Sequence, residues 1–130
     1  MFDIKPVSDV IGAEVSGADL AEVDDAAFDE IQLAWMEHCV LLFRDQKIDA
    51  GELVAFSKRF GELDVAPPNE NGEGGFGGFS EVLVLSNVKE NGKAIGALGN
   101  AEAQWHTDMN YLDKPPTGSV LLSVEVPDKG

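Results

Sequence analysis

Residues 104–111 of the chain read QWHTDMNY and contain one of its two histidines, His106, two positions before Asp108. On a β-strand, residues i and i+2 point to the same face of the sheet. An extended segment here would direct the imidazole of His106 and the carboxylate of Asp108 toward one point. We therefore predict a strand over this stretch, with Trp105 and Thr107 on its opposite face.

An imidazole and a carboxylate without a serine or cysteine nucleophile make a poor nucleophilic site. They could, however, supply two of the ligands of a metal ion. Two histidines and one carboxylate on one face leave open positions on Fe(II) for substrate and oxygen. Taken alone, however, the His-x-Asp pattern arises often by chance and favours an ordinary hydrogen-bonded pair. The tripeptide leaves both interpretations open.

Two segments have the features of amphipathic helices. Residues 24–39 place large apolar side chains on one face and begin with aspartates that can cap the helix. The second helix begins with a D-x-x-E pattern at Asp49 and Glu52, close to a capping box, and Gly61 is placed to end it. The apolar positions are Phe28, Ile31 and Trp35 in the first helix and Leu53, Phe56 and Phe60 in the second.

Short apolar segments predict the strands. We expect one or two strands within residues 7–17, a buried strand at 40–43 (VLLF) and another at 81–88 (EVLVLSNV). Residues 119–126 (SVLLSVEV) alternate with period two, which predicts a strand with one more polar face. The order of strands, two helices and further strands predicts an α+β fold, with the helices packed on an antiparallel sheet.

Two glycine-rich segments predict long loops. Residues 66–80 (APPNENGEGGFGGFS) cannot form a regular element, and Phe76 and Phe79 indicate a loop that closes over something apolar. Residues 89–103 also predict a loop, with an Asn-Gly turn at 91–92. Lids over a substrate and simple solvent-exposed connections are equally compatible with this composition.

Composition narrows the class of protein. The 130 residues fit one domain, and an apolar fraction of 44% is enough for a core. A formal net charge of −15 disfavours nucleic acid and membrane partners. The lone Cys39 excludes an internal disulfide, and neither a signal peptide nor an apolar run of about 20 residues is visible. We expect a cytoplasmic protein.

Longer segments carry a family resemblance. WHTDMNYLDKPP (105–116), HCVLLFRDQKIDAGELVAFSKRFGEL (38–63) and VLVLSNVKENGKAIG (82–96) resemble the TauD/TfdA family of Fe(II)- and 2-oxoglutarate-dependent dioxygenases. The resemblance implies a double-stranded β-helix (jelly-roll) core flanked by helices. It also implies Fe(II) held by His106, Asp108 and a second histidine, with 2-oxoglutarate as cosubstrate. The implied reaction hydroxylates a small organic acid-type substrate and decarboxylates 2-oxoglutarate to succinate.

The remaining ligands of such a site are not in this sequence. No histidine follows Asp108 and no arginine follows Arg59, whereas the family has a distal histidine, a threonine and an arginine that binds 2-oxoglutarate. These would lie beyond Gly130. Residues 127–130 predict a turn, and the strand predicted at 119–126 would have an exposed apolar edge. Both features predict a further strand that returns beside it. We expect residues 1–130 to be the incomplete N-terminal part of one dioxygenase domain, inactive by itself.

Other residues and other functions are also compatible with parts of the sequence. His38, at a helix end, is expected to bond a carbonyl rather than iron, and Arg44 and Arg59 to be surface or helix-end charges. Asn87 could line a pocket, but an asparagine at a strand end is more often a turn former. Two alternatives are a non-catalytic, truncated β-fold binding module and a metal-dependent hydrolase that adds Glu102 to the pair. The primary substrate and a possible homo-oligomer stay open.

Overall fold

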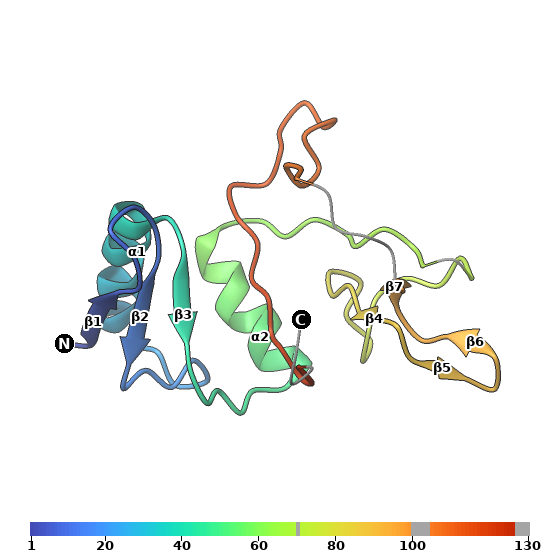
Figure 1. Cartoon of the computed structure of the whole chain (residues 1–130), viewed down its shortest axis with the longest axis horizontal. Helices are drawn as coiled ribbons and strands as arrows, with labels where there is room; N and C mark the ends of the chain where they lie inside the picture. The colour runs from blue at the N-terminus through green and yellow to red at the C-terminus, as the bar shows by residue number, and fades with distance from the viewer. Residues whose placement is uncertain (70, 100–104, 127–130) are drawn as a thin grey trace. The chain divides into compact units, whose positions relative to one another are not determined.

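The computed structural model describes residues 1–69, 71–99 and 105–126. The chain divides into two compact units, Met1–Glu52 and Leu53–Gly130. The described residues mix helices with small sheets (Figure 1), which confirms the α+β class. Their sheets have three, two and two strands. A jelly roll is not formed by this described part of the chain, so that expectation is not confirmed.

The first unit contains a three-stranded sheet in the order β1-β2-β3. β1 (Asp3–Pro6) pairs antiparallel with β2 (Ala13–Ser16), and β2 pairs parallel with β3 (Leu41–Phe43). β2 confirms a strand within the predicted range 7–17. The first half of that range instead forms the turn between β1 and β2, and β1 precedes it.

Helix α1 (Asp25–His38) connects the two parallel strands and packs beside β3 (Figure 1). It begins as predicted, because the Asp24 carboxylate accepts a hydrogen bond from the Ala27 N–H at 2.8 Å. It ends at Cys39, whose N–H donates to the Trp35 carbonyl at 2.8 Å. The predicted apolar face is confirmed at Phe28 and Ile31, whereas Trp35 is half-buried and Ala34 is buried in addition.

The core of the first unit follows the two periodicities of helix and strand. Along β2, Ala13 and Val15 are 1% and 2% exposed, and Ile31 of α1 is 1% exposed. Glu14 lies between them and points to the other face, where its Oε2 accepts from Arg44 Nε at 3.2 Å. The alternation explains how a four-residue strand buries two side chains and still presents a charged one.

The prediction that residues 40–43 form a strand is confirmed, but the expectation of complete burial is wrong. Leu42 is 38% exposed and Val40 is 54% exposed. Because β3 is an outer strand of its sheet and α1 covers one face, only alternate side chains of this strand are shielded.

Gln46 joins two segments of the first unit with one side chain. Its Oε1 accepts from the Leu20 N–H at 3.0 Å, and its Nε2 donates to the carbonyls of Ala18 and Arg44, both at 2.9 Å. The segment that follows β2 is thereby tied to the segment that follows β3. Leu20 is 8% exposed, so this connection also holds a core residue in place.

Helix α2 (Ala50–Ser57) has the capping box that its sequence predicts. The Asp49 N–H donates to Glu52 Oε2 at 2.8 Å, and the Glu52 N–H donates to Asp49 Oδ1 at 2.9 Å. A 3-10 turn (Lys58–Phe60) continues α2, and Gly61 with φ 149° ends it. No helix in the described part of the chain is both long and apolar enough to cross a membrane.

The second unit contains two small sheets. β4 (Leu85–Ser86) pairs parallel with β7 (Ala97–Leu98), and β5 (Lys89–Glu90) pairs antiparallel with β6 (Lys93–Ala94). The Asn-Gly turn at 91–92 is confirmed. Its φ angles of 49° and 82° are both positive, as the favoured two-residue hairpin turn requires.

Three sequence predictions are wrong in this unit. Of the strand expected at 81–88, only the two residues of β4 form a strand, and Leu85 is half exposed. The loop expected at 89–103 contains short strands in its described part. Residues 119–126 form no strand, and Val124 is 91% exposed. A strand needs a neighbour to take its N–H and C=O groups, and no described segment lies in register along 119–126.

The burial of Ile31 gives a first test of the fold. Replacing Ile31 with alanine should lower the free energy of unfolding by about 2–4 kcal/mol, because a fully buried side chain is lost and a cavity is left. Leu33→Ala in the same helix, where the leucine is 73% exposed, should change it by less than about 0.5 kcal/mol. Urea denaturation of both variants would measure the difference, and equal effects would contradict this packing.

Gly96 gives a second test, in the other unit. A Cβ at Gly96 would lie 2.7 Å from the Val84 carbonyl oxygen and 2.8 Å from the Ser86 nitrogen, so Gly96→Ala should force the β4–β7 pair apart at a cost of about 1–3 kcal/mol. Gly74→Ala is the matched control, because its Cβ would meet nothing closer than 3.7 Å. Thermal unfolding should separate the two variants; an unaffected Gly96→Ala would contradict the close approach.

Candidate metal centre

His106 and Asp108 do not lie on a strand. Residues 105–107 have no regular structure, and a turn follows at 108–111. Met109 has φ 49°, in the left-handed region, and the Leu112 N–H donates to its carbonyl at 3.1 Å. The predicted strand is therefore wrong. The left-handed conformation of Met109 bends the chain immediately after Asp108.

The two side chains nevertheless converge. His106 Nε2 donates to Asp108 Oδ1 at 2.9 Å, since an ionised carboxylate can only accept. The second oxygen, Oδ2, accepts a hydrogen bond from Ser119 Oγ at 3.2 Å. The side chains of His106 and Asp108 are 67% and 57% exposed. The pair is thus open to a metal ion or a small molecule from solution.

The spacing of the pair fits two interpretations. Two donor atoms about 2.1 Å from one ion and at right angles to each other lie about 3.0 Å apart. The 2.9 Å between His106 Nε2 and Asp108 Oδ1 agrees with adjacent positions on a divalent metal. The same distance is that of an ordinary hydrogen bond, the alternative that the tripeptide alone favours. In the first interpretation Nε2 and Oδ1 would face an ion, and in the second they face each other.

The remaining candidates do not complete this site. No group of three or more His, Cys, Asp or Glu side chains able to hold a metal occurs within residues 1–69, 71–99 and 105–126. His38 lies at the end of α1, and Glu102 lies outside the described residues. Among the described residues, His106 and Asp108 are therefore a pair of candidate ligands without a third beside them.

The aromatic residues around the pair are open to solvent. Trp105 and Tyr111 are both exposed, so neither builds an apolar wall against another described side chain. Arg44 pairs with Glu14, and Arg59 lies in the 3-10 turn after α2, as expected of surface and helix-end charges.

The predicted loop at 66–80 is confirmed as irregular. Its ends are joined by the Ala66 N–H, which donates to the Ser80 carbonyl at 2.9 Å, and Phe76 pairs with Phe79 across a two-residue turn. Phe76 is 56% exposed. Most of this ring therefore faces solvent rather than an enclosed apolar space.

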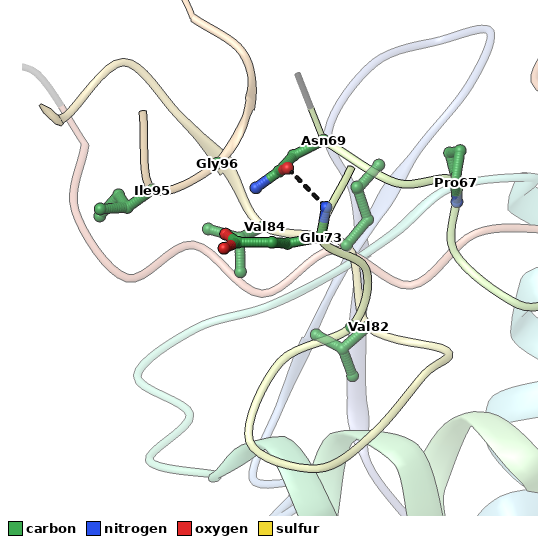
Figure 2. A pocket seen from close by; sticks show the side chains of 9 residues that line it. Pro67, Asn69, Glu73, Val82, Val84, Ile95 and Gly96 are labelled. Carbon is green, nitrogen blue, oxygen red and sulfur yellow. Dashed lines mark hydrogen bonds between the residues drawn. The ribbon is translucent and has the colours of Figure 1, made fainter. Parts of the chain in front are cut away.

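A small cavity lies beside this loop in the second unit (Figure 2). Asn69 shapes its edge, because its Oδ1 accepts from the Asn71 and Glu73 N–H groups at 2.9 and 3.0 Å. The cavity volume is about 20 Å³, room for roughly one water molecule. It cannot hold a five-carbon dicarboxylate, and Asn87 is not among its lining residues.

Ser119 is the contact that the sequence did not predict. Its hydroxyl reaches Asp108 from eleven positions away. On the sequence it was one of several polar residues on a predicted strand face, and no local pattern connects it to the pair. Only the course of the loop between them brings the two residues together.

Comparisons with known proteins agree with one another. The family model described as "Taurine catabolism dioxygenase TauD, TfdA family" matches residues 3–130. An (S)-phenoxypropionate/alpha-ketoglutarate-dioxygenase from Sphingobium herbicidovorans is 31% identical, over 99% of this chain and 42% of the relative. A pentalenolactone F synthase from Streptomyces avermitilis is 38% identical, over 92% and 39%. A Pseudomonas putida alpha-ketoglutarate-dependent sulfate ester dioxygenase is 33% identical, over 99% and 39%.

Solved structures give the same result. A crystal structure of a putative alpha-ketoglutarate-dependent taurine dioxygenase from Burkholderia xenovorans aligns with a TM-score of 0.56 and 34% identity, over 62% of this chain and 28% of that one. A taurine dioxygenase from the same organism aligns with a TM-score of 0.54 and 34% identity, over 63% and 28%. The chain spans about 40% of the length of the curated relatives described above, which it covers by 42%, 39% and 39%.

Proposed function

Since the chain belongs to the taurine catabolism dioxygenase TauD, TfdA family, we propose that it serves in a 2-oxoglutarate-dependent dioxygenase. The proposed reaction couples decarboxylation of 2-oxoglutarate to succinate with hydroxylation of a small organic acid-type substrate. The observation that carries the proposal is the 2.9 Å approach of His106 Nε2 to Asp108 Oδ1. It places an imidazole and a carboxylate at the spacing of neighbouring ligands.

The pair fits Fe(II) by its donor set. An imidazole nitrogen and a carboxylate oxygen are the two ligand types of the two-histidine, one-carboxylate centre, in which positions stay open for other molecules. Fe(II) bound there would supply the activation of O₂ that the oxidation needs. We propose His106 and Asp108 as ligands, with the third ligand coming from outside the described residues.

The residues of this chain contribute orientation and charge. The Asp108 carboxylate partly neutralises a divalent cation, and its hydrogen-bonded contact with His106 holds the two donor atoms together before an ion arrives. The exposure of both side chains gives the ion access. An ion bound between them would take the place of the Nε2 proton that His106 now donates to Oδ1.

The organic acid-type substrate is supported by the names of two relatives. One acts on (S)-phenoxypropionate and another is a sulfate ester dioxygenase. We further propose that residues 1–130 form the N-terminal part of one jelly-roll dioxygenase domain, and that the protein is cytoplasmic. The share of the curated relatives that the chain covers, about 40%, supports the first of these.

Substitution of the pair tests the proposal in the complete protein. His106→Ala and Asp108→Ala should each lower substrate-dependent succinate release by about a hundredfold or more, because each removes a ligand. His38→Gln and Asp113→Ala are the matched controls, one for each residue type, and should keep near-normal rates. Retained turnover in either pair variant would remove that residue from the ligand set. Turnover with Zn²⁺ in the absence of O₂ would instead favour the metal-dependent hydrolase.

The 130-residue chain gives a second test. Purified alone and supplied with Fe(II), 2-oxoglutarate and O₂, it should release little or no succinate, since among its described residues His106 and Asp108 have no third candidate ligand beside them. The measurement is succinate formed per mole of chain, compared with Asp108→Ala as background. Succinate release well above that background would show that the chain completes the site by itself.

A further inference from the structure

The Asp108 carboxylate is held on both sides. Oδ1 accepts from His106 Nε2 at 2.9 Å, and Oδ2 accepts from Ser119 Oγ at 3.2 Å. We propose that Ser119 is a positioning residue that keeps Oδ2 occupied, so that Asp108 offers only Oδ1 to the metal beside His106. This inference rests on the proposed function, because it assumes that the pair binds a metal.

The argument follows from the shape of a carboxylate. Rotation about the Cβ–Cγ bond of Asp108 would exchange its two oxygens or turn both toward one ion. A donor fixed on Oδ2 opposes that rotation and favours coordination through one oxygen. Coordination through one oxygen leaves one more position open for other molecules on a six-coordinate ion, which a two-histidine, one-carboxylate centre needs. Ser119 thereby affects how many positions stay open.

The chemistry of the donor also suits this role. A serine hydroxyl donates one hydrogen bond and carries no charge, so it orients the carboxylate without cancelling the negative charge that attracts the cation. A lysine or arginine in its place would compete with the metal for the same charge. Ser119 and the pair are all exposed, which keeps the expected effect modest.

The loop between the two residues explains the contact. Met109, with φ 49°, turns the chain directly after Asp108. Pro115 and Pro116 then restrict the backbone before the chain returns at Ser119. The hydroxyl therefore reaches Asp108 from a segment whose path is set by a left-handed residue at one end and two prolines near the other.

The test uses the two histidines of the chain as reporters. In metal-free protein titrated with Mn²⁺, paramagnetic broadening of the His106 imidazole Hε1 signal measures binding at the pair. The His38 signal, assigned with His38→Gln, serves as an internal reference. This comparison is needed because a net charge of −15 attracts divalent ions to other carboxylates. Ser119→Ala should weaken the His106-specific binding about threefold to tenfold.

Two variants separate positioning from a structural role. Ser119→Thr keeps the hydroxyl and should bind Mn²⁺ within about twofold of the unmodified protein, and Ser123→Ala, in the same exposed segment, should do the same. The midpoint temperature of thermal unfolding, measured without metal, should stay within about 2 °C of the unmodified protein for Ser119→Ala, Ser119→Thr and Ser123→Ala. None of the substituted side chains is buried.

The outcomes distinguish this inference from the proposed function. If Asp108→Ala abolishes selective broadening of His106 and Ser119→Ala binds like the unmodified protein, the role of Ser119 is overturned and the metal site stands. Failure of Ser119→Thr to restore binding would overturn it as well. If Asp108→Ala broadens His106 normally, or if His106 is never broadened more than His38, both the metal site and the role of Ser119 are overturned.

Discussion

Parallel pairing of β2 with β3 is the constraint from which the first unit is built. Two parallel neighbours cannot be joined by a hairpin, so the chain must cross from the end of one to the start of the other, and α1 is that crossover. Backbone hydrogen bonds hold the end of α1 and the start of β3 against the start of β2. The Gly12 N–H donates to the His38 carbonyl and the Ala13 N–H to the Val40 carbonyl, both at 2.9 Å. Burial of the α1 face against the sheet follows from this connection.

Features set by neighbouring residues were predictable from the sequence, whereas of the features that need distant partners only the strands β2 and β3 were predicted correctly. The cap at Asp24, the box at Asp49 and Glu52 and the turn at 91–92 depend on side chains within four positions, and all are present. The apolar runs at 81–88 and 119–126 could only become full strands beside partners far away in the chain. Where no described segment supplies a partner, the alternating pattern does not form a strand.

The pair of His106 and Asp108 shows both a local feature and a distant one. The two-residue spacing of His106 and Asp108 indicated correctly that their side chains would meet, although the expected strand was wrong and the pair lies in an irregular segment that a turn follows. Ser119 escaped prediction because its contact closes a loop of eleven positions. An exposed pair of this kind contributes little to the free energy of unfolding. Its physical importance lies in holding two donor atoms at the spacing of neighbouring ligands.

Gln46 has a consequence for how the first unit opens. Its amide bonds three backbone groups, those of Ala18, Leu20 and Arg44, so the segments on either side of the crossover cannot loosen separately while this side chain is in place. Amide hydrogens in the two segments should therefore exchange with solvent deuterium as one cooperative group rather than independently. A single polar side chain thus couples the opening of these two segments.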